Sequence, residues 1–182
     1  MKRALLVIDV QNEYFNGKMT VSYPIGTLGK ILSAIDTANR NDIPVIIIQH
    51  TASADSATFA KGSMAWEVHP EVISKPHKYV IEKPAPGSFT GTGLEQILKD
   101  ENVDTVVISG YMTQMCCDTT SRQAFHMGYK VEFLSDATGT LDISSKAGNV
   151  GAEALHKAIL VTQSSVFSTV LSTGDWIKAV ES

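Results

Sequence analysis

Two adjacent cysteines, Cys116 and Cys117, are the only thiols of the chain, and they follow an apolar run and a short link. A thiol that opens a helix can act as a nucleophile, because the helix dipole and unpaired backbone N–H groups favour a thiolate. The same N–H groups can hold an oxyanion. Position alone leaves a second interpretation open, since most free cysteines are small buried hydrophobic residues.

Asp9 and Lys83 are charged residues at the ends of two other apolar runs. A carboxylate at such a place is costly unless it is hydrogen-bonded or functional. Asp9 could accept the proton of a thiol and return it to a leaving amine, and Lys83 could stabilise either charged group. Taken singly, Asp9 could cap a turn and Lys83 could be solvated. Together with a cysteine they indicate thiol chemistry.

The segments that must position these residues alternate between two patterns. Short runs rich in Val, Ile and Leu predict strands buried on both faces of a parallel sheet, at Leu5–Val10, Val45–Gln49, Tyr79–Glu82, Val103–Ser109, Lys130–Leu134 and Ala158–Thr162. Helical spacing of apolar residues predicts crossover helices at Thr27–Asn39, Thr92–Asp100, Cys116–Met127 and Lys146–His156, with Gly128 as a C-cap. The pattern predicts an α/β fold, a three-layer doubly wound sheet of about six parallel strands, with residues 1–182 as one domain.

The carboxyl ends of the predicted strands gather the candidate groups at one edge. Ligands of such sheets bind beyond those ends, near the point where strand order reverses. Asp9 follows the first strand, His50 the second and Lys83 the third, and the segment from Gly110 to Cys117 follows the fourth. The topology therefore predicts that Asp9, Lys83 and Cys116 meet.

Composition excludes several classes of partner. The formal net charge is -4 without a block of like charge, which argues against nucleic acid and against a membrane surface. The first apolar run is cut by Asp9 after five residues, and no run reaches membrane-spanning length. Adjacent cysteines cannot staple a secreted scaffold. We therefore expect a cytoplasmic protein with a small-molecule substrate.

Weaker motifs leave a binding module as an alternative. Gly91-Thr92-Gly93 faintly resembles a dinucleotide fingerprint, but Gln96 stands where its third glycine belongs. No tight histidine–carboxylate pair accompanies the histidines, so we expect no metal and no cofactor. Three of the five histidines lie outside the predicted helices, namely His50, His69 and His77. The other two, His126 and His156, lie on predicted helices and are interpreted as ordinary surface or packing residues.

At these residues the sequence resembles the isochorismatase-like cysteine hydrolase family, which includes nicotinamidases and carbamoylsarcosine amidohydrolases. The similar segments are Val7 to Asn12, Lys83-Pro84 with Ser88-Phe89 and Gly91-Thr92, and Gly110 to Cys117 continuing to Ala124. The resemblance runs from about Ala4 to Phe167. Its nucleophile stands six residues after the glycine, which selects Cys116 over Cys117.

The resemblance implies a catalytic triad of Asp9, Lys83 and Cys116 and cleavage through a thioester. It also implies a cis peptide between Met112 and Thr113, which turns backbone N–H groups toward the oxyanion. Residues implied to line the substrate pocket are Phe15, Trp66, Phe89, Tyr111 and Gln114. A homo-oligomer, dimer or tetramer, is expected as well, with the apolar segment Phe167–Val180 as interface material.

Two departures from the family pattern narrow the range of reactions that we expect. Metal-binding nicotinamidases carry an Asp-x-His pair that occurs nowhere in this chain, and true isochorismatases, which cleave a vinyl ether, lack the cysteine. Cys116 therefore implies cleavage of a C–N bond in a small amide, ureide or lactam, with nicotinamidase- or isochorismatase-type hydrolysis as the alternative. Segments Ile48–His50, Gly62–Pro70 and Asp118–Phe125 resemble a streptothricin-hydrolase-like branch.

The two cysteines should differ in reactivity. Neighbours at a helix start project about 100° apart, so one thiol can face the oxyanion site while the other packs inward. We expect Cys116 to be the thiol of low pKa and Cys117 to be a small buried hydrophobic residue.

Overall fold

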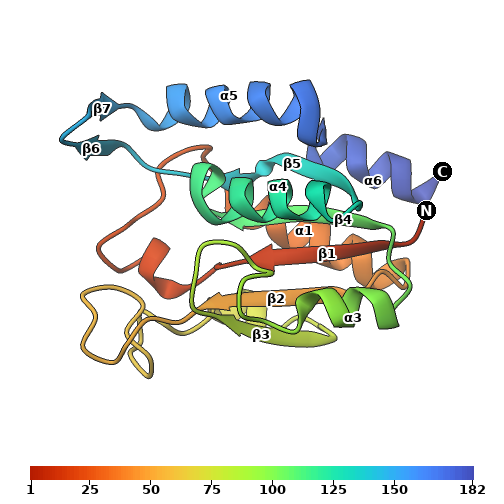
Figure 1. Cartoon of the computed structure of the whole chain (residues 1–182), viewed down its shortest axis with the longest axis horizontal. Helices are drawn as coiled ribbons and strands as arrows, with labels where there is room; N and C mark the ends of the chain where they lie inside the picture. The colour runs from red at the N-terminus through yellow and green to blue at the C-terminus, as the bar shows by residue number, and fades with distance from the viewer.

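A computed structural model describes residues 1–182 as a six-stranded sheet covered by helices on both faces (Figure 1). The strand order is β3-β2-β1-β4-β5-β8, and every neighbouring pair is parallel. The strands are β1 (Arg3–Ile8), β2 (Val45–His50), β3 (Tyr79–Lys83), β4 (Thr105–Tyr111), β5 (Lys130–Gly139) and β8 (Thr169–Leu171). The predicted doubly wound α/β fold is confirmed.

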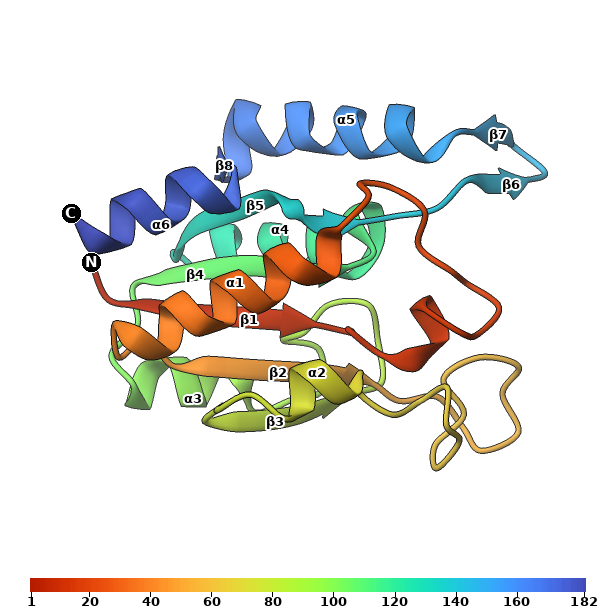
Figure 2. The ribbon, with the colours of Figure 1, turned by 180° about the vertical axis from the view of Figure 1, so that it is seen from behind.

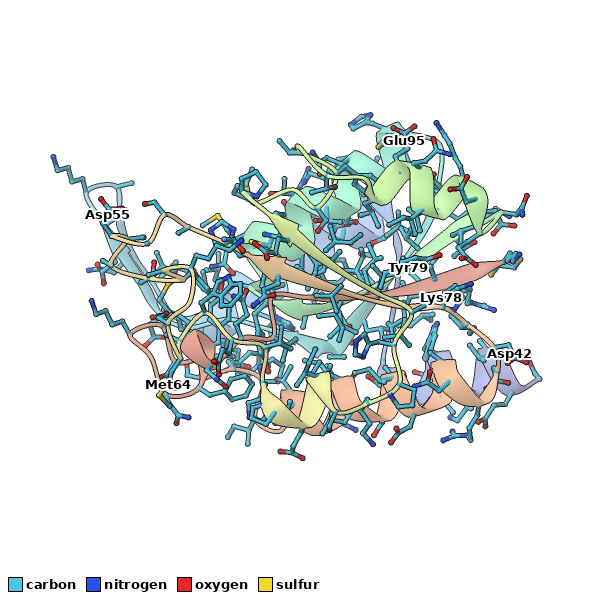
Figure 3. The ribbon with its side chains drawn as sticks, turned by 90° about the horizontal axis from the view of Figure 1, so that it is seen from below. Asp42, Asp55, Met64, Lys78, Tyr79 and Glu95 are labelled. Carbon is cyan, nitrogen blue, oxygen red and sulfur yellow. The ribbon has the colours of Figure 1, made fainter.

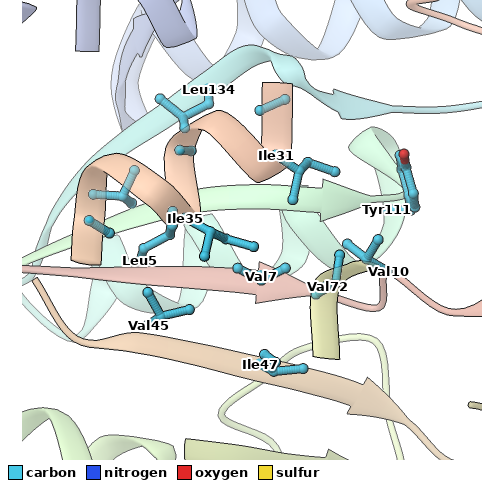
Figure 4. Close-up of a cluster of buried hydrophobic side chains, with 14 of the residues drawn as sticks. Leu5, Val7, Val10, Ile31, Ile35, Val45, Ile47, Val72, Tyr111 and Leu134 are labelled. Carbon is cyan, nitrogen blue, oxygen red and sulfur yellow. The ribbon is translucent and has the colours of Figure 1, made fainter. Parts of the chain in front are cut away.

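The helices form two outer layers because alternate residues of the central strands point to opposite faces. Leu5 and Val7 of β1 pack on one face with α1 (Thr27–Arg40), α2 (Pro70–Ile73) and α6 (Thr173–Glu181). Figure 4 shows this cluster, and Figure 2 shows α1 and α2 over the sheet. Leu6 and Ile8 pack on the other face with α3 (Leu94–Asp100) and α4 (Asp118–His126), which Figure 1 shows in front.

The strand order reverses between β1 and β4, which lie side by side at the centre of the sheet. Gly110 pairs with Ile8 at the carboxyl ends of these strands. It has φ +112°, and a Cβ there would collide with the backbone of Ile8. Glycine is therefore required where the segments that carry Asp9 and Cys116 leave the sheet together.

The sixth strand was placed wrongly by the sequence pattern. Ala158–Thr162 is the last part of α5 (Ala152–Thr162), and β8 takes the edge beside β5 instead. A short apolar run does not distinguish a buried strand from a packed helix. The predicted helix at Lys146–His156 likewise begins only at Ala152, whose N–H donates to Asp142 Oδ1 at 2.7 Å. Before it lies a hairpin of β6 (Ile143–Ser145) and β7 (Gly148–Val150).

Loop 51–66 and the β6–β7 hairpin extend beyond the carboxyl edge of the sheet (Figure 1). Figure 3 shows Asp55 and Met64 of this loop at that end, whereas Asp42 and Lys78 lie toward the amino edge. The remaining ordered elements are a 3-10 turn at Asn12–Tyr14 and π-helical turns at Thr113–Cys117 and Gln163–Phe167. No helix is long and apolar enough to cross a membrane.

The C-terminal segment packs against its own chain, and an interface at Phe167–Val180 stays a prediction. Trp176 is fully buried, and its Nε1 donates to Glu132 Oε2 at 2.8 Å. Arg3 binds both oxygens of the same carboxylate, at 2.8 and 2.9 Å. Leu171, Ile177 and Val180 are partly buried against the same core.

Replacing Trp176 with Phe should lower the free energy of unfolding by about 1–3 kcal/mol, because it removes a buried hydrogen bond and leaves a cavity. Urea denaturation followed by circular dichroism measures the change. Val166, which is 60% exposed, offers the control. Val166→Ala should stay within about 0.5 kcal/mol of the parent. Equal denaturation midpoints for Trp176→Phe and the parent would contradict the packing described.

Candidate active site

Asp9, Lys83 and Cys116 lie in direct contact at the carboxyl edge of the sheet. Lys83 Nζ is 2.8 Å from Asp9 Oδ2 and 3.4 Å from Cys116 Sγ, and it donates to the carbonyl of Ala85 at 3.0 Å. The ammonium therefore lies within reach of a carboxylate, a sulfur and a backbone carbonyl. Asp9 and Lys83 are fully buried, and Cys116 is 6% exposed. The predicted proximity of the three groups agrees with these distances.

Local backbone geometry aims the carboxylate at this point. Asp9 has φ +52°, a left-handed conformation that aspartate tolerates better than most residues. Its N–H donates to Ile48 of β2, and its carbonyl accepts from Gln11. Strain of this kind persists where the surroundings enforce it and is frequent at functional sites.

Burial governs the protonation of the three groups. It raises the pKa of Asp9 above its ordinary value, although the Lys83 ammonium opposes the rise. Burial works against the Lys83 charge, but Asp9 and Cys116 outweigh it, so the pKa of Lys83 is raised. The resting site thus holds an ammonium, a carboxylate and a protonated thiol.

The expected low pKa of Cys116 is wrong. Burial raises the pKa of this thiol, and the charge of Asp9 raises it further, while Lys83 only partly compensates. Burial outweighs any effect of the helix terminus, although Cys116 lies in the π-helical turn Thr113–Cys117 that leads directly into α4. Cys117 is fully buried and packs in the core, as expected for the neighbouring cysteine.

The cis peptide also differs from the expectation. It joins Tyr111 to Met112, whereas the bond between Met112 and Thr113 was expected to be cis. The position carried over from the resemblance was therefore one residue too late, since the cis bond follows Tyr111, the last residue of β4.

A chain of ring contacts borders the site, and we call it the aromatic arc. Consecutive ring centroids lie 4.3 to 5.8 Å apart along His69, Phe15, Tyr111, Tyr14, Phe59 and His50. Phe15 and Tyr111, two predicted pocket residues, also line a cavity of about 280 Å³ between the 3-10 turn and the start of α1. The structure therefore brings these two residues together.

The other predicted pocket residues are distributed differently. Trp66 Nε1 donates to Thr51 Oγ1 at 2.8 Å, which fixes its ring within loop 51–66. Gln114 lies in the turn that carries the thiol, and its Oε1 is buried without a partner. Phe89 stacks on Tyr129, 6.2 Å away, and Tyr129 precedes β5 at the amino edge of the sheet. Phe89 also packs against the core cluster that contains Cys116, and its role in binding stays a prediction.

Sequence reasoning missed a histidine that holds the turn of the thiol. His156 of α5 is 3% exposed, and its Nε2 lies 2.9 Å from the carbonyl oxygen of Ser135. A carbonyl can only accept, so Nε2 carries the proton, and burial lowers the pKa of the ring so that it is neutral. Nδ1 therefore accepts from the Thr113 hydroxyl, 2.8 Å away. An isolated histidine in a helix gave no signal of this contact.

Two further residues lie near the charged groups. Burial raises the pKa of Tyr14 well above its ordinary value, and the charges of Asp9 and Cys116 add to the rise. His50, paired with Lys83 in register, interacts with Asp9 and Lys83 by charge. His50 was noted as following a strand but was considered only as a metal ligand. No group of three histidine, cysteine or acidic side chains has the arrangement of a metal site.

Comparisons with known proteins agree on one family. The family model described as isochorismatase domain matches residues 3–175. A crystal structure from Burkholderia xenovorans, described as an isochorismatase, is 42% identical, with a TM-score of 0.97 over 99% of this chain and 88% of that chain. The isochorismatase family protein YddQ of Bacillus subtilis is 33% identical over 98% of this chain and its own full length.

Relatives with named activities are hydrolases. Nicotinamidase 3 of Arabidopsis thaliana is 30% identical over 87% of this chain and 78% of its own length. Other relatives are named streptothricin hydrolase, from Streptomyces noursei, and ureidoacrylate amidohydrolase. A structural neighbour from Pseudomonas syringae is named a cysteine hydrolase.

The neutral His156 predicts a pH-dependent stability. Its pKa is lowered from 6.5 in the folded chain, so the unfolded chain binds the proton more readily. The free energy of unfolding should therefore keep its full value above about pH 6.5 and fall as the pH drops below it. His156→Asn removes the titrating ring and should flatten this slope, measured by urea denaturation between about pH 5 and 8.

The exposed His126 supplies a matched control. His126→Asn should keep the slope of the parent, and part of the slope should survive in His156→Asn because burial also lowers the pKa of His50. A parental slope in His156→Asn would contradict the assignment of a buried neutral ring.

Proposed function

The chain belongs to the isochorismatase family of hydrolases, and we propose that it cleaves a C–N bond of a small amide, ureide or lactam with Cys116 as nucleophile. One observation carries the proposal, the contact of a thiol, a carboxylate and an ammonium in a site closed to bulk water. Thiol hydrolysis requires a nucleophile, a base and a group that stabilises negative charge, and these three side chains can fill the three roles.

The first half-reaction forms a thioester. Asp9 accepts the Cys116 proton while the sulfur electron pair attacks the carbonyl carbon, and the carbonyl π electrons move to oxygen. Collapse of this tetrahedral intermediate breaks the C–N bond, and the amine leaves with the proton that Asp9 returns. Lys83 stays charged throughout and stabilises the negative charge that passes between carboxylate and sulfur.

The second half-reaction releases the acid. Water attacks the thioester carbon as Asp9 takes one of its protons, and the C–S bond then breaks to regenerate the thiol. The N–H groups of Met115 and Cys117 are occupied by the Met112 carbonyl, at 3.1 and 3.2 Å. We therefore assign the oxyanion to the remaining N–H groups of the turn, including that of Cys116.

Other activities have less support. A metal-dependent nicotinamidase reaction would need ligands for the ion, and the chain has no Asp-x-His pair. A vinyl-ether hydrolase or a nucleotide-binding module would leave the buried triad unused. Metal independence, a cytoplasmic location and a substrate within the streptothricin-hydrolase-like branch stay predictions from the sequence.

A screen of small amides, ureides and lactams, read by release of ammonia or amine, tests the reaction. Cys116→Ala should lower turnover by at least about 10³-fold, and Asp9→Asn should lower it strongly, because each removes a group that bonds to the reacting atoms. Hydroxylamine should trap the acyl group as a hydroxamate in the parent. Activity should survive exhaustive chelation.

Cys117→Ala is the matched control, since it removes the neighbouring thiol. It should retain most activity and cost about 1 kcal/mol of stability. If Cys117→Ala is inactive and Cys116→Ala is active, the assignment of the nucleophile is wrong. Full activity in both variants would exclude thiol chemistry.

We also propose that the chain forms a homo-oligomer, as the family resemblance implies. Light scattering at micromolar concentration should give a mass of at least twice 19.6 kDa. A mass of one chain across the concentration range would exclude the oligomer.

A further inference from the structure

The cavity at the start of α1 is lined by two tyrosines whose hydroxyls have no partner within the chain. Its volume of about 280 Å³ equals the space of about nine water molecules in the liquid. Tyr14 of the 3-10 turn and Tyr111 of β4 both line it. No residue of the proposed triad does, so the cavity is separate from the candidate active site.

The two tyrosines are hydrogen-bond donors in the wall of this cavity. Tyr14 is 3% exposed and Tyr111 is 2% exposed, and their ring centroids lie 5.4 Å apart in an edge-on contact. Figure 4 shows Tyr111 at the end of β4, on the face of the sheet that α1 covers. Burial raises the pKa of both phenols, and no hydrogen bond within the chain acts on either. Both hydroxyls therefore keep their protons and have them free to donate.

The start of α1 supplies further donors. Its N-cap residue is Gly26, which has φ +80° and no side chain that could cap the helix. The Thr27 hydroxyl donates back to the Pro24 carbonyl, and the N–H groups of Thr27 and Leu28 have no acceptor within the chain. Gly26, Thr27 and Leu28 all line the cavity. The positive end of a 14-residue helix therefore borders the same space as the two phenols.

Backbone hydrogen bonds fix segment 20–26, which closes one side of the cavity. The Val21 N–H donates to the Tyr14 carbonyl at 3.0 Å, and the Ser22 N–H donates to the Thr140 carbonyl at 2.9 Å. Figure 2 shows the chain passing beyond the carboxyl edge of the sheet after β1 and returning to the start of α1. The cavity is therefore preformed, as most small-molecule sites are.

The lining of the cavity defines the chemistry of a ligand. Phenols can donate to any acceptor, whereas unpaired N–H groups at a helix N-terminus favour a negative charge. No acidic side chain lines the cavity to oppose that charge. The nearby carboxylates of Asp9 and Glu13 already have partners, in Lys83 and in the Lys18 N–H. The rest of the wall is apolar and consists of Phe15, Val21, Pro24, Ile25 and Leu28.

We propose that this cavity is a second binding site, which holds the carboxylate of a small apolar acid. The hydroxyls of Tyr14 and Tyr111 and the N-terminus of α1 donate to the carboxylate oxygens, and the apolar side chains contact the body of the acid. The site binds its ligand without covalent chemistry. It uses no group of the proposed reaction and stands independently of it.

Benzoate and acetophenone test the site on the full chain. They have the same number of non-hydrogen atoms, and each joins a carbonyl to a phenyl ring, but only benzoate is charged. Neither contains a C–N bond that the proposed triad could cleave. Isothermal titration calorimetry at neutral pH measures both dissociation constants. Benzoate should bind at least about tenfold more tightly than acetophenone, because its hydrogen bonds are charge-assisted and the helix terminus favours an anion.

Tyr14→Phe and Tyr111→Phe each remove one hydroxyl and keep the ring contacts. Each should weaken benzoate binding by about tenfold or more, because a hydrogen bond to a charged group is lost. Neither should lower the melting temperature of the ligand-free chain, since neither hydroxyl is bonded within it. Tyr129 offers the matched control, because it lines a different cavity beside Phe125 and Phe167. Tyr129→Phe should keep the benzoate affinity of the parent.

Several outcomes would overturn the site. Equal affinities of benzoate and acetophenone, or no benzoate binding in the millimolar range, would exclude an anion site. Parental affinity in both Tyr14→Phe and Tyr111→Phe would show that benzoate binds elsewhere, at the thiol for example. An equal loss in Tyr129→Phe would show that the effect does not come from this cavity. Failure of the amide screen would overturn the proposed reaction and leave benzoate binding as expected here.

Discussion

The buried ion pair of Asp9 and Lys83 is the interaction on which the candidate site depends. Both side chains are fully buried, and their charged atoms lie 2.8 Å apart. A buried charge without its partner is strongly destabilising, so the ends of β1 and β3 must be held in register across β2, which separates them. The backbone of Asp9 does this through β2, since its N–H donates to Ile48. The sheet order therefore brings the two charges together, and the ion pair in turn requires that the ends of β1 and β3 keep this alignment.

Much of this arrangement could be predicted, because parallel strands bring their carboxyl ends to one edge. Asp9, Lys83 and Cys116 were found by residue type and by position after a strand. The limits of the pattern appear at Ala158–Thr162, a continuous apolar run that forms helix and not strand. The residues of this run did not by themselves indicate a helix. The start of α5 is fixed by a hydrogen bond from Ala152 to Asp142, ten residues earlier in the chain.

The parts of the site that escaped prediction depend on tertiary contacts. His156 meets Thr113 across 43 residues, and His50 gains its significance from the Lys83 and Phe59 beside it. The pKa of Cys116 was expected to fall because a helix terminus was considered alone. In the folded chain, burial and the neighbouring carboxylate act together and raise it. A pattern of residue types cannot report how deeply a side chain is buried.

A thiol of raised pKa is compatible with catalysis when its base is already in contact. Asp9 and Cys116 both contact Lys83, so in the proposed reaction attack on a carbonyl and proton transfer to Asp9 can proceed together without a free thiolate. Lys83 contacts both groups, and its charge stabilises the negative charge whether it lies on oxygen or on sulfur. Such a thiol should react slowly with electrophiles that the site does not bind, because they lack the contacts that align them with the sulfur. Selectivity among substrates would then arise from the residues that position the substrate, because the sulfur would react only with a carbonyl that binding has aligned with it.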